Sequence, residues 1–413
     1  MSETVAVSKQ SFLNGTMKRF MFAMLLANIA VSMYDTLLPL YLKQLNANVV
    51  QVGLFFTLAQ IIPLALQILG GWISDSLGRL RSIAWGSVAG VFSFIGIILA
   101  PTWEWVLLGI GLSAVTRALV GPSFGSFIAE QSSEENRGRV YALSESIFSI
   151  VTIVGPPLGG WLAETYGFKM MLIAGAMLYI VATLVRVSMA QLAAKGETGE
   201  KRSLSLGVLK NSLGEMTGLI LAGGVITWLL ITDGVRDVAF SLSFQLMPLY
   251  LEGIGRMSLV QIGWLNSIFG VTSLAVTMPA GWLSDKKGER VAIACGFLLE
   301  FSALMVFIYA PPSFLGYAIS WALFGLGVGL MSPAYQSLIS KAVPDRLRGT
   351  AMGLMNTSLG LFSLPAPAIG AQLWSRFTPR LPFMITAVVS IASVVPVWLK
   401  FRLPARKDAE PTP

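Results

Sequence analysis

Long apolar runs separated by short polar segments are the dominant pattern along the 413-residue chain. A helix that crosses a lipid bilayer needs about 20 mostly apolar residues, so each run predicts one membrane-spanning helix. The predicted spans are 17–45, 49–73, 82–101, 105–128, 142–162, 168–189, 221–251, 259–283, 291–310, 314–339, 350–374 and 382–399. The pattern therefore predicts an all-α membrane protein with twelve transmembrane helices.

Composition supports this class and excludes others. Hydrophobic residues make up 54% and charged residues 12% of the chain, whereas a soluble domain carries about 25% charged residues, so no sizeable soluble domain is expected. Cys295 is the single cysteine and histidine is absent. This excludes an internal disulfide framework and removes the usual metal ligand and general base. Proton chemistry near neutral pH would then depend on carboxylates.

The 29 lysines and arginines are unevenly distributed between the two sides of the predicted topology. Most fall in loops on the side of both termini, and such an excess is typical of cytoplasmic loops. We therefore expect a multi-pass protein of the cell membrane (plasma or inner) with both termini in the cytoplasm. The amino terminus carries no evident removable signal. Insertion into the lipid bilayer explains the net charge of +8, so no nucleic-acid partner is expected.

The chain repeats itself at a nearly constant spacing. Segment 38–42 (LPLYL) returns at 247–251 (MPLYL), and segment 70–75 (GGWISD) returns at 280–285 (AGWLSD). Six spans per copy is an even number, so both copies enter the membrane in the same direction, and such a duplication places a cavity between the halves near the midplane. The predicted domains are an N-terminal six-helix bundle (1–190), a cytoplasmic linker (191–216) and a C-terminal six-helix bundle (217–413).

The loop after the second predicted span carries a motif that has a counterpart in the second half. Its residues are Gly71, Asp75, Gly78, Arg79 and Arg81, and the second copy contains Gly281 and Asp285. The motif resembles the signature loop G-x-x-x-D-[RK]-x-G-[RK]-[RK] of the major facilitator superfamily, except that Ser76 and Leu80 replace basic residues. This resemblance implies a secondary transporter with a pseudo-symmetric 6+6 fold, and it implies a gating role for the loop. A charged turn that only orients the spans is the alternative.

The fifth predicted span contains Gly155, Pro156, Gly159 and Gly160. These residues resemble the motif typical of the superfamily's drug and proton antiporters, although the upstream glycines of that motif are missing. Proline removes a helix hydrogen bond and glycine permits close packing, so we expect a hinge and a tight interhelical seam. A partial repeat around Pro367 leaves general hinge chemistry as the alternative to an export motif.

Ionisable side chains inside the predicted spans are candidate functional groups, because a charge near the bilayer centre costs about 2.5 to 3.5 kcal/mol. The candidates are Asp35, Arg117, Asp233, Arg236, Asp237 and Glu300, with Glu145 nearer the cytoplasmic end of its span. Each can bind a substrate or a proton, or can serve in a static structural pair.

In the first span, Asn28, Ser32 and Asp35 follow an i, i+4, i+7 pattern that places them on one helical face, and Tyr34 flanks this stripe. Lipid cannot satisfy polar groups, so the stripe is expected to line the central cavity. Asp35 could there bind a proton or a cation, or it could be paired permanently with an arginine.

In the seventh span, Arg236 can bridge one of its neighbours Asp233 and Asp237 while the other stays free. This trio could change partners as protons come and go, or it could neutralise itself as a static cluster. Glu300 has apolar neighbours in the sequence. It could be a protonation site, a docking point for a cationic substrate, or a neutral carboxyl group bonded to the next helix.

Arg117 lies four residues before Gly121, a spacing that resembles the superfamily's fourth-span motif R-x-x-x-G, which is associated with proton coupling. A buried arginine without a partner is very unfavourable. We therefore expect a carboxylate partner for Arg117, either Glu145 or Asp35.

The sequence contains no phosphate-binding glycine-rich loop, no cluster of metal ligands and no hydrolase motif. We therefore expect no enzyme activity and no cofactor. The favoured function is proton-coupled efflux of amphiphilic or cationic small molecules by alternating access, performed by a monomer. An uptake carrier or symporter for a metabolite such as a sugar or an organic anion is the alternative, and a membrane sensor without transport is a third hypothesis.

Overall fold

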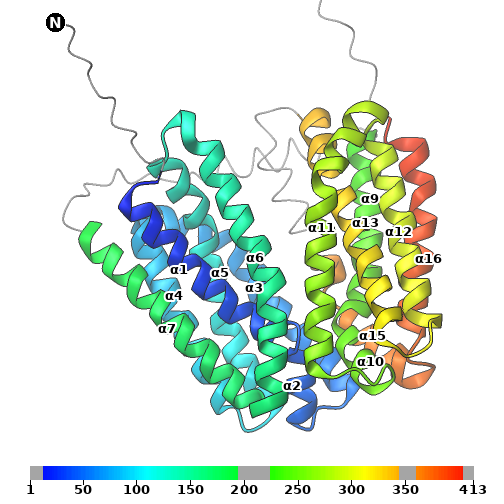
Figure 1. Ribbon diagram of the computed structural model, residues 1–413, viewed down its shortest axis with the longest axis horizontal. Helices are drawn as coiled ribbons and strands as arrows, with labels where there is room; N and C mark the ends of the chain where they lie inside the picture. The colour runs from blue at the N-terminus through cyan, green and yellow to red at the C-terminus, as the bar shows by residue number, and fades with distance from the viewer. Residues whose placement is uncertain (1–12, 194–223, 344–359, 403–413) are drawn as a thin grey trace, which may run out of the picture.

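The computed structural model describes residues 13–193, 224–343 and 360–402, and all regular structure in these ranges is helical. The helices form two bundles that lie side by side (Figure 1). The first bundle contains α1 (Gly15–Asp35), α2 (Leu38–Gln44), α3 (Val49–Leu77), α4 (Arg79–Leu99), α5 (Trp103–Gln131), α6 (Glu134–Tyr166) and α7 (Phe168–Ala193). The second contains α9 (Val225–Ser243), η1 (Phe244–Leu246), α10 (Met247–Gly253), α11 (Leu259–Lys287), α12 (Glu289–Tyr309), α13 (Phe314–Ala342), α15 (Ala366–Arg376) and α16 (Leu381–Lys400).

This architecture confirms the predicted fold class. Nine of the described helices are long and apolar enough to cross a membrane, and α1 with α2 passes the same test as a bent pair. The predicted spans 221–251 and 350–374 begin outside the described ranges, and α9 to α10 and α15 form their described parts. The predicted linker also falls mostly outside those ranges, so the domain boundaries stay a prediction.

The first span is not the continuous helix expected over 17–45. It bends by 52° between α1 and α2, just before Pro39 in the first turn of α2. The seventh span breaks at the repeated position, where η1 separates α9 from α10 and Pro248 lies in the first turn of α10. Proline cannot donate the backbone hydrogen bond that would continue the preceding helix, but it is tolerated in a first turn. Both breaks follow from this rule.

Helices α3 and α11 begin and end in the same way. Asn48 and Gln51 form a reciprocal capping box at the start of α3, and Ser258 with Gln261 does so for α11. A capping box satisfies two free donors of the first helical turn. Gly78 and Gly288 end the two helices at φ +86° and +89°, a conformation that favours glycine. The duplicated sequence therefore encodes duplicated local structure.

The two bundles contact each other through α6 with α11 and through α3 with α15. A Cβ atom at Gly263 of α11 would lie 2.5 Å from the carbonyl oxygen of Pro156, and one at Gly53 of α3 would lie 2.6 Å from that of Pro367. These repeat-related contacts lie towards the end of the molecule where α2 and α10 are found (Figure 1), and α6 and α11 diverge towards the opposite end. An exposed ion pair of 2.6 Å between Lys43 and Glu252 joins the halves at the α2–α10 end.

Candidate functional site

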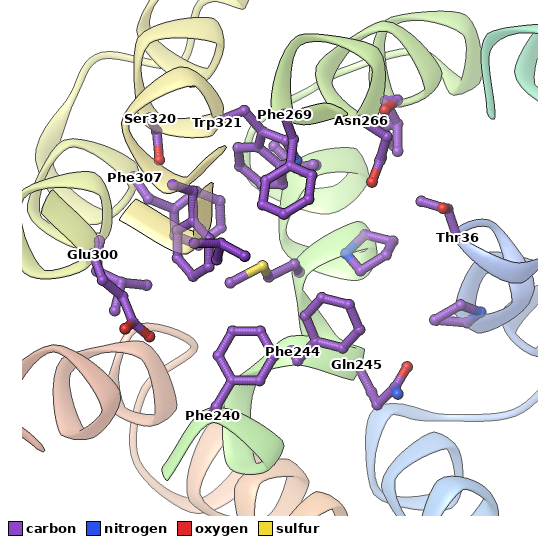
Figure 2. A pocket seen from close by; sticks show the side chains of 18 of the residues that line it. Thr36, Phe240, Phe244, Gln245, Asn266, Phe269, Glu300, Phe307, Ser320 and Trp321 are labelled. Carbon is purple, nitrogen blue, oxygen red and sulfur yellow. Dashed lines mark hydrogen bonds between the residues drawn. The ribbon is translucent and has the colours of Figure 1, made fainter. Parts of the chain in front are cut away.

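A cavity of about 500 Å³, called here the central cavity, lies between the two bundles. Residues of α1, α2, α3 and α6 line it from one half, and residues of α9 to α13 line it from the other. Figure 2 shows aromatic rings gathered around this space, with Glu300 on one side and Thr36 on the other. The labelled rings are Phe240, Phe244, Phe269, Phe307 and Trp321. Its walls are thus mainly apolar, with a few charged groups.

Asp35 is exposed at the end of α1 and lines the central cavity. The expected stripe does not continue along this cavity, because α6 packs against it. A Cβ atom at Gly155 would lie 2.6 Å from Ser32, and the Ser32 hydroxyl donates to the carbonyl of Val151 on α6 at 3.4 Å. Asn28 lines a different cavity, inside the first bundle.

Tyr34 points away from the central cavity. It is buried in the first bundle, where its ring meets Phe94 edge-on with centroids 5.4 Å apart. Asp35 and Tyr34 are therefore adjacent in sequence but line separate spaces.

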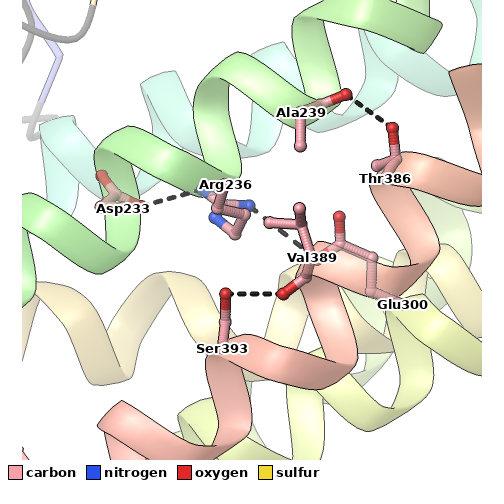
Figure 3. A network of polar contacts seen from close by, with 7 residues as sticks. All are labelled: Asp233, Arg236, Ala239, Glu300, Thr386, Val389 and Ser393. Carbon is pink, nitrogen blue, oxygen red and sulfur yellow. Dashed lines mark hydrogen bonds and ion pairs between the residues drawn. The ribbon is translucent and has the colours of Figure 1, made fainter.

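Arg236 of α9 forms the centre of a charged cluster in the second bundle (Figure 3). Its guanidinium is 3.0 Å from Asp233 on the same helix and 4.0 Å from Glu300 on α12. Asp237 lines the central cavity and takes part in no ion pair among the described residues. Arg236 thus pairs with Asp233 and not with Asp237, the other aspartate near it in the sequence.

Glu300 is deeply buried, with its side chain 2% exposed. Arg236 approaches it, so the carboxylate is not as isolated as its apolar sequence neighbours suggested. Neither carboxylate oxygen has a hydrogen-bond partner among the described residues, although Glu300 lines the central cavity. A carboxylate at a cavity wall whose negative charge is only partly balanced by an arginine can bind a proton or a cation.

The space inside the first bundle, called here the arginine cavity, has a volume of about 480 Å³. Arg117 lines it and donates to the Ser113 hydroxyl at 3.2 Å. The expected carboxylate partner is not in place: Asp35 is near enough for electrostatic attraction, but Arg117 forms no ion pair within the described part of the chain. Glu145 is exposed on α6 and lines neither cavity.

Arg186 of α7 also lines the arginine cavity and was not predicted as a site residue. The predicted span ended at residue 189, which placed Arg186 near the membrane surface. The helix continues to Ala193, and Arg186 is only 5% exposed. The sequence does contain a signal for this burial, because a run of mostly apolar and small residues follows Arg186.

The two copies of the signature loop lie beside ion pairs of opposite polarity in the two halves. Arg79 at the start of α4 pairs with Glu130 of α5 at 3.3 Å. At the repeated positions, Glu289 at the start of α12 pairs with Lys341 of α13. The sequence motif did not predict either partner.

The structure describes only some of the other predicted loop residues. The side chains of 67–77, including Asp75 and the position of Gly71, lie outside the described part. Arg81 and Asp285 are exposed, and a Cβ atom at Gly281 would meet nothing within 4 Å.

The glycines of α6 pack against backbone on two sides. Gly159 lies against the carbonyl group of Met33 on α1, and Gly160 lies against that of Leu259 on α11. The tight seam expected from glycine is thus present, and it joins α6 to both halves. Pro156 lies inside an uninterrupted helix from Glu134 to Tyr166.

The comparisons with known proteins agree with this geometry. The family model of the Major Facilitator Superfamily matches residues 20–256 and 239–413. The chain is 28% identical to a multi-drug resistance efflux pump PmrA homolog from Lactococcus lactis, covering 90% of this chain and 91% of the relative. It is 24% identical to the multidrug resistance protein MdtH of Cronobacter sakazakii, covering 87% and 88%.

Among solved structures, the nucleoside transporter NupG superposes with a TM-score of 0.76 at 13% identity, covering 93% of this chain and 99% of that one. This likeness shows the fold and leaves the substrate open. The family model spans both bundles and agrees with the signature loop in each half, so the chain belongs to the Major Facilitator Superfamily.

Proposed function

We propose that this protein exports amphiphilic or cationic small molecules in exchange for protons, through alternating access of the central cavity to the two sides of the membrane. The observation that carries the proposal is the lining of that cavity, where aromatic side chains, nearly all from the second half, lie beside the carboxylates of Asp35, Asp237 and Glu300. Apolar walls with a few placed charges suit an amphiphile. The names of the two relatives, an efflux pump and a multidrug resistance protein, support export as the direction.

Asp35 is the proposed proton carrier. It is exposed to the central cavity, and Arg117 attracts its ionised form without pairing with it. A proton on Asp35 would remove that attraction, and a cationic substrate would compete with the proton for the same carboxylate. Exchange follows from this competition. Asp233, Arg236 and Glu300 form the second proposed charged site, in the other half.

Tyr34, Asn28 and Glu145 complete the proposed set of coupling residues. Tyr34 and Asn28 line the arginine cavity together with Arg117, so they can respond to a change of charge there. Glu145, a carboxylate on α6 that forms no ion pair among the described residues, could pair with Arg117 in another conformation.

In the proposed cycle, the described conformation is closed at the α2–α10 end and gives access from the opposite end, which is the cytoplasmic side with both termini. The loops around Gly78 and Gly288 would close that side in the second conformation, in a multi-pass protein of the cell membrane. The proposed unit is a monomer that moves its substrate without a cofactor and without covalent chemistry.

Proteoliposomes with an imposed proton gradient provide the test, with the amphiphilic cation ethidium as the probe. The unmodified protein should accumulate ethidium inside the vesicles when the lumen is acidic, because protons that leave the lumen drive the exchange. Asp35→Asn should bind ethidium more weakly, lose the competition between proton and cation, and lose the gradient-driven accumulation. Glu104→Gln makes the same chemical change at an exposed residue in the first turn of α5 and should behave like the unmodified protein.

Proton-driven accumulation that survives in Asp35→Asn would exclude Asp35 from coupling. Movement of neutral sugars or organic anions down their own gradients, without ethidium transport, would instead favour the uptake carrier.

A further inference from the structure

The arginine cavity has the opposite charge to the central cavity. Arg117 and Arg186 line it, and none of the described residues that line it is acidic. The described lining of the central cavity, in contrast, includes three carboxylates and one arginine, Arg236. The two spaces therefore differ in the sign of the charge that lines them.

Arg186 is bound only by neutral groups among the described residues. One of its terminal nitrogens donates to the Ser87 hydroxyl at 2.9 Å. Ser87 uses its own hydrogen to bind the carbonyl of Ile83 at 2.7 Å, so its oxygen accepts from Arg186 and stays neutral. The hydroxyl of Tyr179 is the other polar group beside the guanidinium.

The guanidinium of Arg186 has donor capacity left over. It carries five N–H groups, and its Nε atom is buried without a hydrogen-bond partner in the described part of the chain. No described carboxylate forms an ion pair with it. A buried cation without a counter-charge is strongly unfavourable, and Arg186 is only 5% exposed.

We propose that the arginine cavity binds an amphiphilic organic carboxylate, whose carboxylate group pairs with Arg186. Arginine presents donors in a planar fork that matches the two oxygens of a carboxylate. The remaining wall includes Phe94, Phe124 and Phe148, which suit an apolar or aromatic body. A halide would meet the charge but leave most of the roughly 480 Å³ and the aromatic wall unused. This site is distinct from the cation site proposed above and does not depend on it.

Calorimetric titration of the full-length protein in nanodiscs of zwitterionic lipid tests the proposal, because such lipid adds no net anionic charge. The probes are 2-naphthoate and its neutral analogue 2-naphthamide. We expect 2-naphthoate to bind at least about tenfold more tightly than the amide, as one charge-assisted pair requires. Arg186→Gln should remove this difference, whereas Arg376→Gln, an exposed arginine of the second bundle, should preserve it.

Equal binding of the two probes overturns the proposal, and so does a preference for 2-naphthoate that persists in Arg186→Gln. If Arg186→Gln does not yield folded protein, Arg117→Gln serves as the second variant, because Arg117 is exposed to the cavity and lies on another helix. It should also weaken 2-naphthoate more than 2-naphthamide. Binding of chloride without binding of 2-naphthoate would overturn the assignment to a carboxylate.

Discussion

The contact of Gly263 with α6 allows a direct test of how the two halves close. A methyl group at Gly263 would lie 2.5 Å from the Pro156 carbonyl oxygen and 2.7 Å from the Pro157 Cα atom. Both neighbours are backbone atoms, so they cannot move aside as a flexible side chain could. The two halves must separate at the α2–α10 end to accommodate Gly263→Ala.

The size of the effect follows from the cost of overpacking. One extra methyl group in a tight contact costs about 1 to 3 kcal/mol, which shifts a two-state equilibrium roughly 5- to 150-fold. The higher helix propensity of alanine is present in both conformations and cancels. Gly53→Ala affects the repeat-related contact with Pro367, and the double variant should cost about 2 to 6 kcal/mol if the two effects add. Nearly complete inversion of an equilibrium requires about 5.5 kcal/mol.

Pulsed electron paramagnetic resonance measures this shift. Replacing the single cysteine, Cys295→Ser, leaves a background for two spin labels at the exposed positions Lys169 and Thr378, one in each half at the α2–α10 end. We expect Gly263→Ala to populate a longer distance between the labels. A control is Gly125→Ala, where an added Cβ atom meets nothing within 4 Å. If both variants give the same distance distribution, the contact does not determine closure and the reasoning fails.

Three further predictions concern charge and turn geometry. Glu300→Gln should weaken ethidium binding about tenfold by calorimetry without weakening a neutral dye of similar size; equal losses for both would contradict a charge role. Lys43→Glu should destabilise closure at the α2–α10 end by about 0.2 to 1 kcal/mol, and adding Glu252→Lys should restore the label distance; a failure to restore it would show that the ion pair does not contribute. Gly288→Ala forces a non-glycine residue to φ +89° and should cost about 1 to 2 kcal/mol in thermal unfolding, whereas Gly281→Ala, in open space, should cost less.

The sequence was sufficient to predict the helices and their duplication, because apolar length is what lipid requires of a span. It did not reveal the breaks before Pro39 and Pro248, although both prolines lie in the repeated segment used to detect the duplication. A hydropathy pattern averages over a window of residues and is insensitive to a single missing backbone donor. Local chemistry at a proline, and not hydrophobicity, determines where these two spans bend.

The sequence identifies charged residues inside the spans, but it does not identify which of them pair. Arg236 and Glu300 lie inside predicted spans, where a charged side chain is unfavourable, so the sequence marks both as candidates. Their approach to 4.0 Å, however, depends on how α9 packs against α12. The same limit applies to Arg117, whose nearest described partner is Ser113 instead of a carboxylate. Pairing across helices depends on tertiary packing, which periodicity along one helix does not contain.

The two halves share their interhelical glycine contacts but differ in their charged residues. Gly53 and Gly263 occupy related positions and approach the backbone of related helices, so one rocking motion about the axis between the halves would open both contacts together. The ion pairs of Arg79 and Glu289 each lie within one half and would persist during that motion. Asp35 belongs to one half and Asp237 to the other, so their separation would change with every cycle. In the proposed mechanism, protonation of Asp35 alters the charge of the central cavity, and this changing separation would alter how closely both carboxylates can approach one bound cation.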